Sequence, residues 1–101
     1  MVKLHITSDQ QNVLPIIQSA ISAKIKRIEI GLRRTEHELQ QFEAKYHIPS
    51  DEFANTYTAE DLDGGDEEYI SWMGELKLRQ AMYEELQVLQ HIEYVTQGVP
   101  G

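Results

Sequence analysis

The stretch that decides the fold is IQSAISAKIKRIEIGLRRTEHELQQFEAKY, residues 17–46. Its apolar positions recur at steps of three and four residues, which is the spacing of a helix that packs along another helix. This seam comprises Ile17, Ile21, Ile25, Ile28, Leu32, Thr35, Leu39, Phe42 and Tyr46. Pro15 suits a first helical turn, and Pro49 disfavours helix at the residue before it. The pattern therefore predicts a helix over residues 15–47.

A second long helix is predicted over residues 66–95. Its apolar residues form two adjacent rows, one with Trp72, Leu76, Tyr83 and Leu86 and one with Leu78, Met82, Leu89 and Ile92. Three acids at residues 66–68 place negative charge at the positive end of its dipole. Residues 48–65 form a connector, in which Ser50 is a candidate N-cap of a short helix and a Gly-Gly pair favours a turn.

The two ends of the chain carry weaker patterns. Residues 2–7, VKLHIT, alternate apolar and polar side chains, which is typical of a half-buried strand. A single strand has open hydrogen-bonding groups along both edges, so we expect it to pair with a second copy or with another protein, unless it is a frayed tail. Residues 98–101 are expected to be a disordered tail.

Together these elements predict an all-α single domain over residues 1–97, a long antiparallel helical hairpin resembling a coiled coil, with a short N-terminal strand. A lone hairpin leaves one side of each apolar stripe in water, so we expect two copies to form a four-helix bundle, a homodimer. The core or dimer seam consists of Ile17, Ile21, Ile25, Ile28, Leu32, Leu39, Phe42, Leu76, Met82, Leu86 and Leu89.

Composition narrows the class of protein further. The chain has 101 residues, 41% of them hydrophobic, with 9 Lys and Arg against 17 Asp and Glu, a net charge of −8. There is no cysteine, no long apolar run and no basic leader followed by an apolar stretch, so the expected location is the cytoplasm. Residues 1–47 carry seven basic and five acidic groups, whereas residues 48–101 carry two and twelve, a net of −10. The acidity therefore belongs to one half and favours a basic partner.

No motif indicates an enzyme, a metal site or a cofactor. HELQQ at residues 37–41 begins like the zinc-binding HExxH, but Gln41 stands where the second histidine ligand is required. DLD at residues 61–63 begins like a calcium loop, but Asp66 stands at the glycine position and Trp72 at the position of the bidentate glutamate. We therefore expect no catalytic residues and no bound cofactor.

A basic group on the first helix leaves two interpretations open. Lys24, Arg27 and Arg34 share one face at helical spacing and could contact nucleic acid. The alternative is an ordinary solvated face, because nearby glutamates dilute the charge and phosphate binding needs several undiluted cations.

Three segments in the second half of the chain carry a family resemblance. FEAKY at residues 42–46, IPSDEF at residues 48–53 and DEE at residues 66–68, followed by Trp72, resemble small prokaryotic antitoxins of type II toxin–antitoxin pairs. Such antitoxins are short, acidic, helical proteins encoded beside a small basic toxin, often ribonuclease-like, which they bind and neutralise. The group often has glycine after the tyrosine of the first segment, where this chain has His47.

The resemblance implies an antitoxin that binds a basic cognate toxin through its acidic second half. The residues expected at that surface are Phe53, Tyr57, Glu60, Asp61, Asp63, Asp66, Glu67, Glu68 and Trp72. Carboxylates there would steer a basic partner, and Trp72 would anchor it unless the indole instead anchors the helical core. Two alternatives stay open: a self-assembling coiled-coil adaptor, and a small dimeric DNA-binding regulator that uses residues 2–7 and the basic face.

Overall fold

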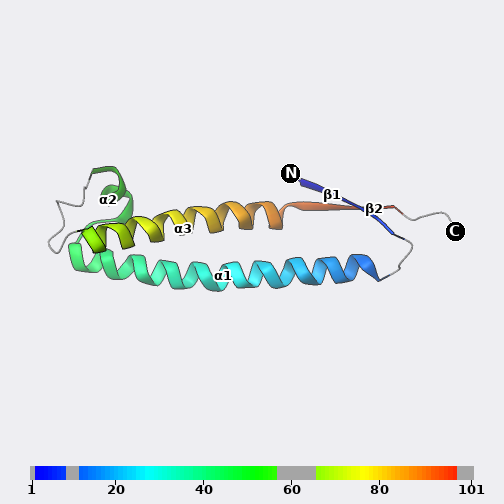
Figure 1. Cartoon of the computed structure of the whole chain (residues 1–101), viewed down its shortest axis with the longest axis horizontal. Coiled ribbons are helices and arrows are strands. Elements are labelled where there is room, and N and C mark those ends of the chain that lie inside the picture. The colour runs from blue at the N-terminus through cyan, green and yellow to red at the C-terminus, as the bar shows by residue number, and fades with distance from the viewer. Residues whose placement is uncertain (1, 9–11, 57–65, 98–101) are drawn as a thin grey trace. The chain divides into compact units, whose positions relative to one another are not determined.

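The computed structural model describes residues 2–8, 12–56 and 66–97, and 79% of these are helical (Figure 1). The elements in chain order are β1 (Val2–Thr7), α1 (Val13–Tyr46), α2 (Ser50–Thr56), α3 (Asp66–Gln90) and β2 (Ile92–Gln97). The predictions of a mostly helical chain, a long first helix and a short N-terminal strand are confirmed. The predicted disordered tail, residues 98–101, lies outside the described residues.

The ends of α1 follow from local backbone chemistry. The N–H of Ile16 donates to the carbonyl of Asn12 at 3.3 Å, so the helix begins at Val13, two residues before the predicted start. Pro15 lies in this first turn, where a backbone donor is not needed. At the other end His47 adopts a left-handed backbone with φ of 58°, and its N–H donates to the carbonyl of Glu43 at 2.9 Å. A left-handed residue of this kind is a common way to end a helix.

The C-terminal part of the chain differs from the prediction. The second long helix was predicted to run to residue 95, and this was wrong, because α3 ends at Gln90 and β2 follows it. The sequence IEYVTQ of β2 is rich in β-branched and aromatic residues, which favour strands over helices. The N–H of His91 donates to the carbonyl of Val88, three residues earlier, at 3.3 Å, and this bond closes a final turn that is tighter than an α-helical one.

The strand β1 pairs with β2 of the same chain, as a parallel two-stranded sheet (Figure 1). We expected β1 to pair with a second copy or with another protein, but one edge of β1 pairs with β2 of the same chain. In the register Val2 faces Ile92 and Leu4 faces Tyr94, so apolar side chains share one face of the sheet. The pairing joins the two ends of the chain, which no pattern local to residues 2–7 indicates.

Contacts divide the chain into two compact units, a division that the expected single domain of residues 1–97 does not anticipate. The first unit comprises Met1–Ile30 and Tyr83–Gly101, and the second comprises Gly31–Met82. Both long helices contribute to both units, and each unit is described by itself below.

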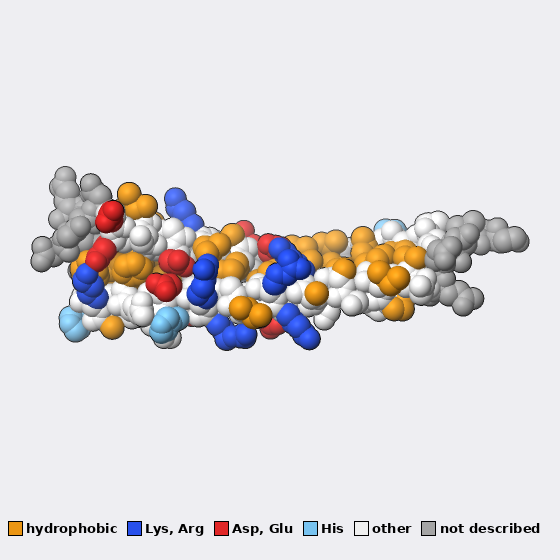
Figure 2. Space-filling model, turned by 60° about the horizontal axis from the view of Figure 1, so that its bottom comes forward, with side chains coloured by type: hydrophobic (Ala, Val, Ile, Leu, Met, Phe, Trp, Pro, Cys, Tyr) orange, Lys and Arg blue, Asp and Glu red, His pale blue; other side chains and the backbone are white. Residues whose placement is uncertain are grey.

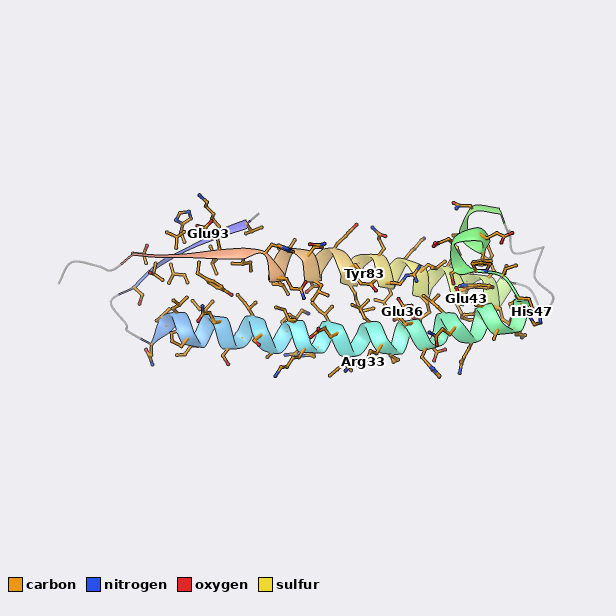
Figure 3. The ribbon with its side chains drawn as sticks, turned by 180° about the vertical axis from the view of Figure 1, so that it is seen from behind. Arg33, Glu36, Glu43, His47, Tyr83 and Glu93 are labelled. Atoms are coloured by element: carbon orange, nitrogen blue, oxygen red, sulfur yellow. The ribbon has the colours of Figure 1, made fainter. Side chains whose placement is uncertain are left out.

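In the second unit α1 and α3 lie side by side, with α2 beside them (Figures 1 and 3). Lys45 near the end of α1 contacts Glu68 near the start of α3. Earlier in α1, Glu36 lies 3.5 Å from the guanidinium of Arg79, which is later in α3. Within this unit the contacts along the two helices therefore run in opposite order.

The first unit has a small core. Among its described residues only Ile28 is buried, at 5% exposure, and the seam residues Ile17, Ile21 and Ile25 are half-buried. Lys24 on α1 and Glu85 on α3 form an ion pair of 3.3 Å at its surface. Exposed pairs of this kind contribute about 0 to 1 kcal/mol, so apolar packing of the seam stabilises this unit more than charge does.

Candidate functional site

The indole of Trp72 lies at the centre of the second unit. It stacks on Phe53 of α2 with ring centroids 3.8 Å apart and on Phe42 of α1 with centroids 5.3 Å apart. Its Nε1 donates to the hydroxyl of Ser50 at 3.0 Å. Trp72 and Phe53 are 0% exposed and form a buried cluster with Leu39. These contacts hold all three helices together at one corner.

Polar groups around this corner are also engaged with one another. The backbone N–H of Ser50 donates to Oε2 of Glu43 at 2.8 Å, which ties the start of α2 to α1. The ammonium of Lys45 and the hydroxyl of Tyr46 both donate to the carboxylate of Glu68 on α3. Figure 3 shows Glu43 and His47 near this end of α1.

The residues of the antitoxin-like pattern thus meet each other in the folded chain. FEAKY supplies Phe42, Lys45 and Tyr46, and each of them contacts Trp72 or Glu68. The spacing that carries the resemblance is therefore explained by packing at a corner of three helices. We interpret the pattern as one that specifies this local structure.

This arrangement corrects part of the predicted partner-binding set. Phe53 and Trp72 cannot contact a partner without unfolding the corner, because both side chains are fully buried. The indole instead takes the other predicted role, as an anchor of the helical core. Glu68 is half-buried and accepts two hydrogen bonds, whereas Glu67 is exposed.

The rest of that predicted set lies in or beside the connector. Asp66 is the first residue of α3. Four members lie outside the described residues, namely Tyr57, Glu60, Asp61 and Asp63.

The predicted seam lies inside the two units. Four of its members are buried or nearly so on α1, namely Ile28, Leu32, Leu39 and the polar Thr35. The remaining members are half-buried: Ile17, Ile21, Ile25, Phe42, Tyr46, Leu76, Met82, Leu86 and Leu89. These side chains pack within the chain, so the most exposed large apolar residues are others.

Several large apolar residues remain exposed, and two of them, Leu78 and Tyr83, belong to the apolar rows predicted for the second long helix. The full set is Val2, Ile16, Ile30, Ile70, Leu78, Tyr83 and Val88. The available signal was their position: Ile16 and Ile30 fall between the seam positions of α1 and so project from another side of the helix.

One residue of the predicted nucleic-acid patch already forms an ion pair within the chain. Lys24 pairs with Glu85, whereas Arg27 and Arg34 are exposed and make no ion pair with any described residue. Figure 2 shows Lys and Arg side chains at several places on the face in view, with apolar side chains between them. The charge of Lys24 is therefore neutralised by Glu85, whereas the charges of Arg27 and Arg34 are not neutralised by any described residue.

The structure offers little for metal chemistry. Gln41, which stands where a zinc motif needs histidine, lies with its Nε2 3.1 Å from Nε2 of His37. Across the described ranges, no three His, Asp or Glu side chains gather in a way that could hold a metal ion. No helix in the described part of the chain is both long and apolar enough to cross a membrane.

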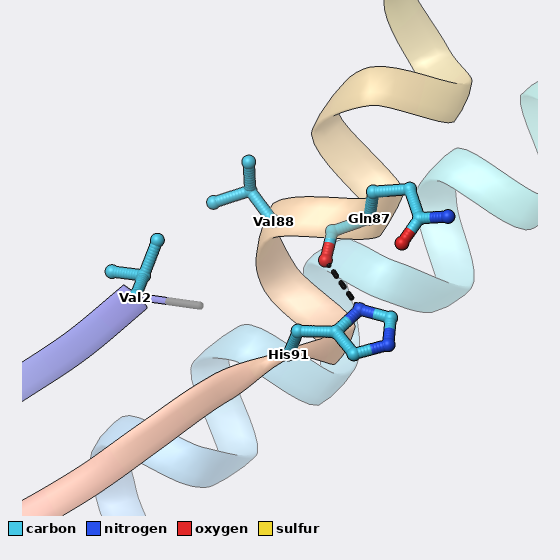
Figure 4. Close-up of a pocket in the computed structure, with 4 residues that line it drawn as sticks. All are labelled: Val2, Gln87, Val88 and His91. Atoms are coloured by element: carbon cyan, nitrogen blue, oxygen red, sulfur yellow. Dashed lines mark hydrogen bonds between the residues drawn. The ribbon is translucent and has the colours of Figure 1, made fainter.

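A small pocket lies in the first unit, at the junction between the end of α3 and the start of β2 (Figure 4). Its volume is about 260 Å³, and it is lined by Val2, Gln87, Val88 and His91. The ring Nδ1 of His91 donates to the carbonyl of Gln87 at 2.8 Å, a contact within the same chain segment. The lining is mostly apolar and has no group arranged for catalysis.

Comparison of the chain with models of protein families, with curated proteins and with solved structures finds no match.

Proposed function

We propose that this chain is a protein-interaction module, an antitoxin that acts in the cytoplasm and neutralises a basic cognate toxin through its acidic second half. The distribution of charge is the observation that carries the proposal, because residues 48–101 hold twelve acidic groups and only two basic ones. Asp51 on α2 has a side chain 93% exposed, and Glu67 on α3 is exposed as well.

The buried corner supports this proposal by giving the acidic surface a rigid base. Phe53 and Trp72 fasten α2 to α1 and α3, so Asp51 and Glu67 project from elements that are fixed to one another. A preorganised acidic surface loses little conformational entropy on binding and speeds encounter with a basic partner.

We further propose that the whole chain forms an antiparallel helical hairpin and that two copies pair as a homodimer, as in a four-helix bundle. The opposite order of contacts along α1 and α3 in the second unit supports the hairpin. The exposed apolar side chains outside the seam support association, since such residues are stabilised by burial.

The experiment is co-expression of the tagged chain with the product of the adjacent gene. We expect the two to co-purify, and we expect cells to grow poorly when the neighbour is expressed alone. The double variant Asp51→Lys/Glu67→Lys should weaken binding by about tenfold or more, mostly through slower association. Glu29→Lys reverses the charge of an exposed residue on α1; it is the control and should leave affinity unchanged. Failure to co-purify together with normal growth would contradict the proposal.

The second candidate function is a self-assembling coiled-coil adaptor without a toxin. Its supporting observation is the same set of exposed apolar residues, which a self-assembling protein buries between copies. Light scattering of the pure chain followed by pull-down separates the candidates, because the adaptor forms a stable assembly and retains no neighbour-encoded protein.

A further inference from the structure

One side of α3 is left uncovered within the second unit. Glu68, Trp72 and Arg79 of this helix contact α1 or α2, so these two neighbours cover its other side. The exposed residues on the open side follow one another at steps of three and four, which places them in one stripe along the helix. We call four of them the α3 face: Glu67, Ile70, Gly74 and Lys77.

Ile70 is the apolar residue of the α3 face. It is 66% exposed, the highest value among the large exposed apolar residues of the described chain. Its burial against another surface would be favourable, because apolar side chains are stabilised when they leave water. A single exposed isoleucine is common on proteins, so its surroundings decide what could cover it.

Gly74 lies one helical turn after Ile70 and has open space above it. A Cβ atom at Gly74 would meet nothing in the described part of the chain within 4 Å, so no contact there requires a glycine. Glycine inside a helix is destabilising relative to alanine, because glycine loses more backbone freedom on folding. The missing side chain leaves room for a side chain of another molecule to approach the helix closely.

The α3 face carries one charge of each sign. Among residues 67–82, which belong to the second unit, Glu67 and Lys77 are the only exposed charged residues. Neither forms an ion pair with a described residue. Glu68 is already paired with Lys45, and Glu75 is half-buried. A uniformly basic or uniformly acidic partner would therefore be repelled by one of the two exposed charges.

The four positions are symmetric about the level of residue 72. Ile70 and Gly74 lie two residues before and after it, and Glu67 and Lys77 lie five residues before and after it. A two-fold axis at this level would place the α3 helix of a second copy antiparallel to the first. Ile70 of each copy would then face Gly74 of the other, and Glu67 of each copy would face Lys77 of the other. A two-fold interface requires self-complementarity of this kind, because both copies use the same surface.

We propose that the α3 face of one copy packs antiparallel on the α3 face of a second copy. Ile70 of each copy fills the space above Gly74 of the other, and a pair of opposite charges lies at each end of the contact. A nucleic-acid backbone offers no apolar group for Ile70, and a basic toxin would meet the charge of Lys77. This inference rests on the homodimer proposed above and names the surface that forms it.

The first test measures the dissociation constant of the full-length dimer by sedimentation over a range of concentrations. Ile70→Asp should raise this constant by about tenfold or more, since it puts a charge in place of the apolar centre of the contact. Ile16→Asp is the matched control and should leave the constant unchanged. Ile16 is 59% exposed on α1, and both isoleucines lie within the first five residues of a helix, where aspartate has the same effect on the helix dipole.

The second test exchanges the two charges of the α3 face. Glu67→Lys and Lys77→Glu should each raise the dissociation constant severalfold at low salt, because each places like charges opposite one another at both ends of the contact. The double variant Glu67→Lys/Lys77→Glu should restore the original constant, since it recreates both opposite-charge pairs. All of these positions are exposed, and circular dichroism of each variant checks that it is folded.

Mixing the two single variants tests the antiparallel register itself. Between one copy of Glu67→Lys and one copy of Lys77→Glu, both facing pairs have opposite charges. The mixture should therefore form mixed dimers more tightly than either variant pairs with itself. Equal affinity of mixed and unmixed dimers would contradict the proposed register.

Three further results would overturn the proposal, and they have different meanings. A dimer that tolerates Ile70→Asp with an unchanged constant overturns the α3 face and leaves the homodimer standing. A chain that is monomeric at every concentration overturns both. If Ile70→Asp leaves self-association unchanged but abolishes co-purification with the product of the adjacent gene, the α3 face belongs to the toxin. The dimer measurements use the pure chain, so they do not depend on whether it neutralises a toxin.

Discussion

His47 follows the last residue of α1, and its backbone adopts a conformation that side chains rarely adopt. Its φ of 58° lies in the left-handed region, where a side chain with a Cβ atom is disfavoured by about 1–2 kcal/mol. Glycine has no such penalty. Glycine is therefore the residue that this position favours on backbone grounds.

We predict that His47→Gly stabilises the chain. The free energy of unfolding should rise by about 0.5–1 kcal/mol, because relief of the left-handed strain exceeds the extra entropy that glycine gains on unfolding. Urea titration, monitored by the fluorescence of Trp72, measures the free energy of unfolding. His37→Gly, inside α1, is the control and should lower the free energy of unfolding by a few tenths of a kcal/mol or more. A neutral or destabilising result for His47→Gly would show that no strain exists at that turn.

At the scale of elements, the pairing of β1 with β2 is the least expected feature. Two parallel strands have few hydrogen bonds, and such small sheets need support from helices or from side-chain pairs. The register places Lys3 opposite Glu93 and Leu4 opposite Tyr94, so the two faces of the sheet differ in polarity. Opposite charges across a strand pair contribute to its stability and help to select its register.

A double-mutant cycle tests the contribution of Lys3 and Glu93 to the sheet. Lys3→Glu alone and Glu93→Lys alone should each lower the free energy of unfolding by about 0.2–1 kcal/mol, because each places like charges opposite one another. The double exchange should restore most of the loss, since it recreates an opposite-charge pair. Thermal unfolding at low salt measures all four proteins. Additive losses in the double variant would mean that the two side chains do not interact.

At the scale of the whole molecule, buried side chains are distributed unequally between the two units. The second unit contains six of the seven buried residues among those described, and the first unit contains only Ile28. Regions with few buried contacts open at lower free energy than regions with a dense core. The first unit should therefore be the less stable of the two in an isolated chain.

Hydrogen exchange measures this difference directly. We predict that the amides of β2 and of residues 16–27 of α1 exchange faster than those of residues 35–46 of α1, because only the latter stretch packs against the Trp72 corner. The experiment is done at low concentration, so that contacts between copies do not protect the first unit. A uniform rate along α1 would contradict the prediction.

Much of the helical structure is predictable because it depends on neighbours in sequence. The seam of α1 sets its length and its buried side, and the prediction of residues 15–47 differs from the observed Val13–Tyr46 by two residues at one end and one at the other. The strand at residues 2–7 is visible from its alternation. Both patterns record local periodicity, which the backbone geometry of helices and strands imposes directly.

The tertiary structure decided what depends on distant residues. Trp72 could anchor either a core or a partner, and only the meeting of Phe42, Ser50 and Phe53 around its indole made it a core residue. The strand β2 pairs with β1, which lies almost the whole chain away in sequence. No pattern near residues 92–97 indicates that pairing, so the sequence predicts a helix there instead. Sequence by itself determined which side of α1 is apolar, whereas packing determined which apolar and charged groups remain exposed, because exposure depends on what the rest of the chain covers.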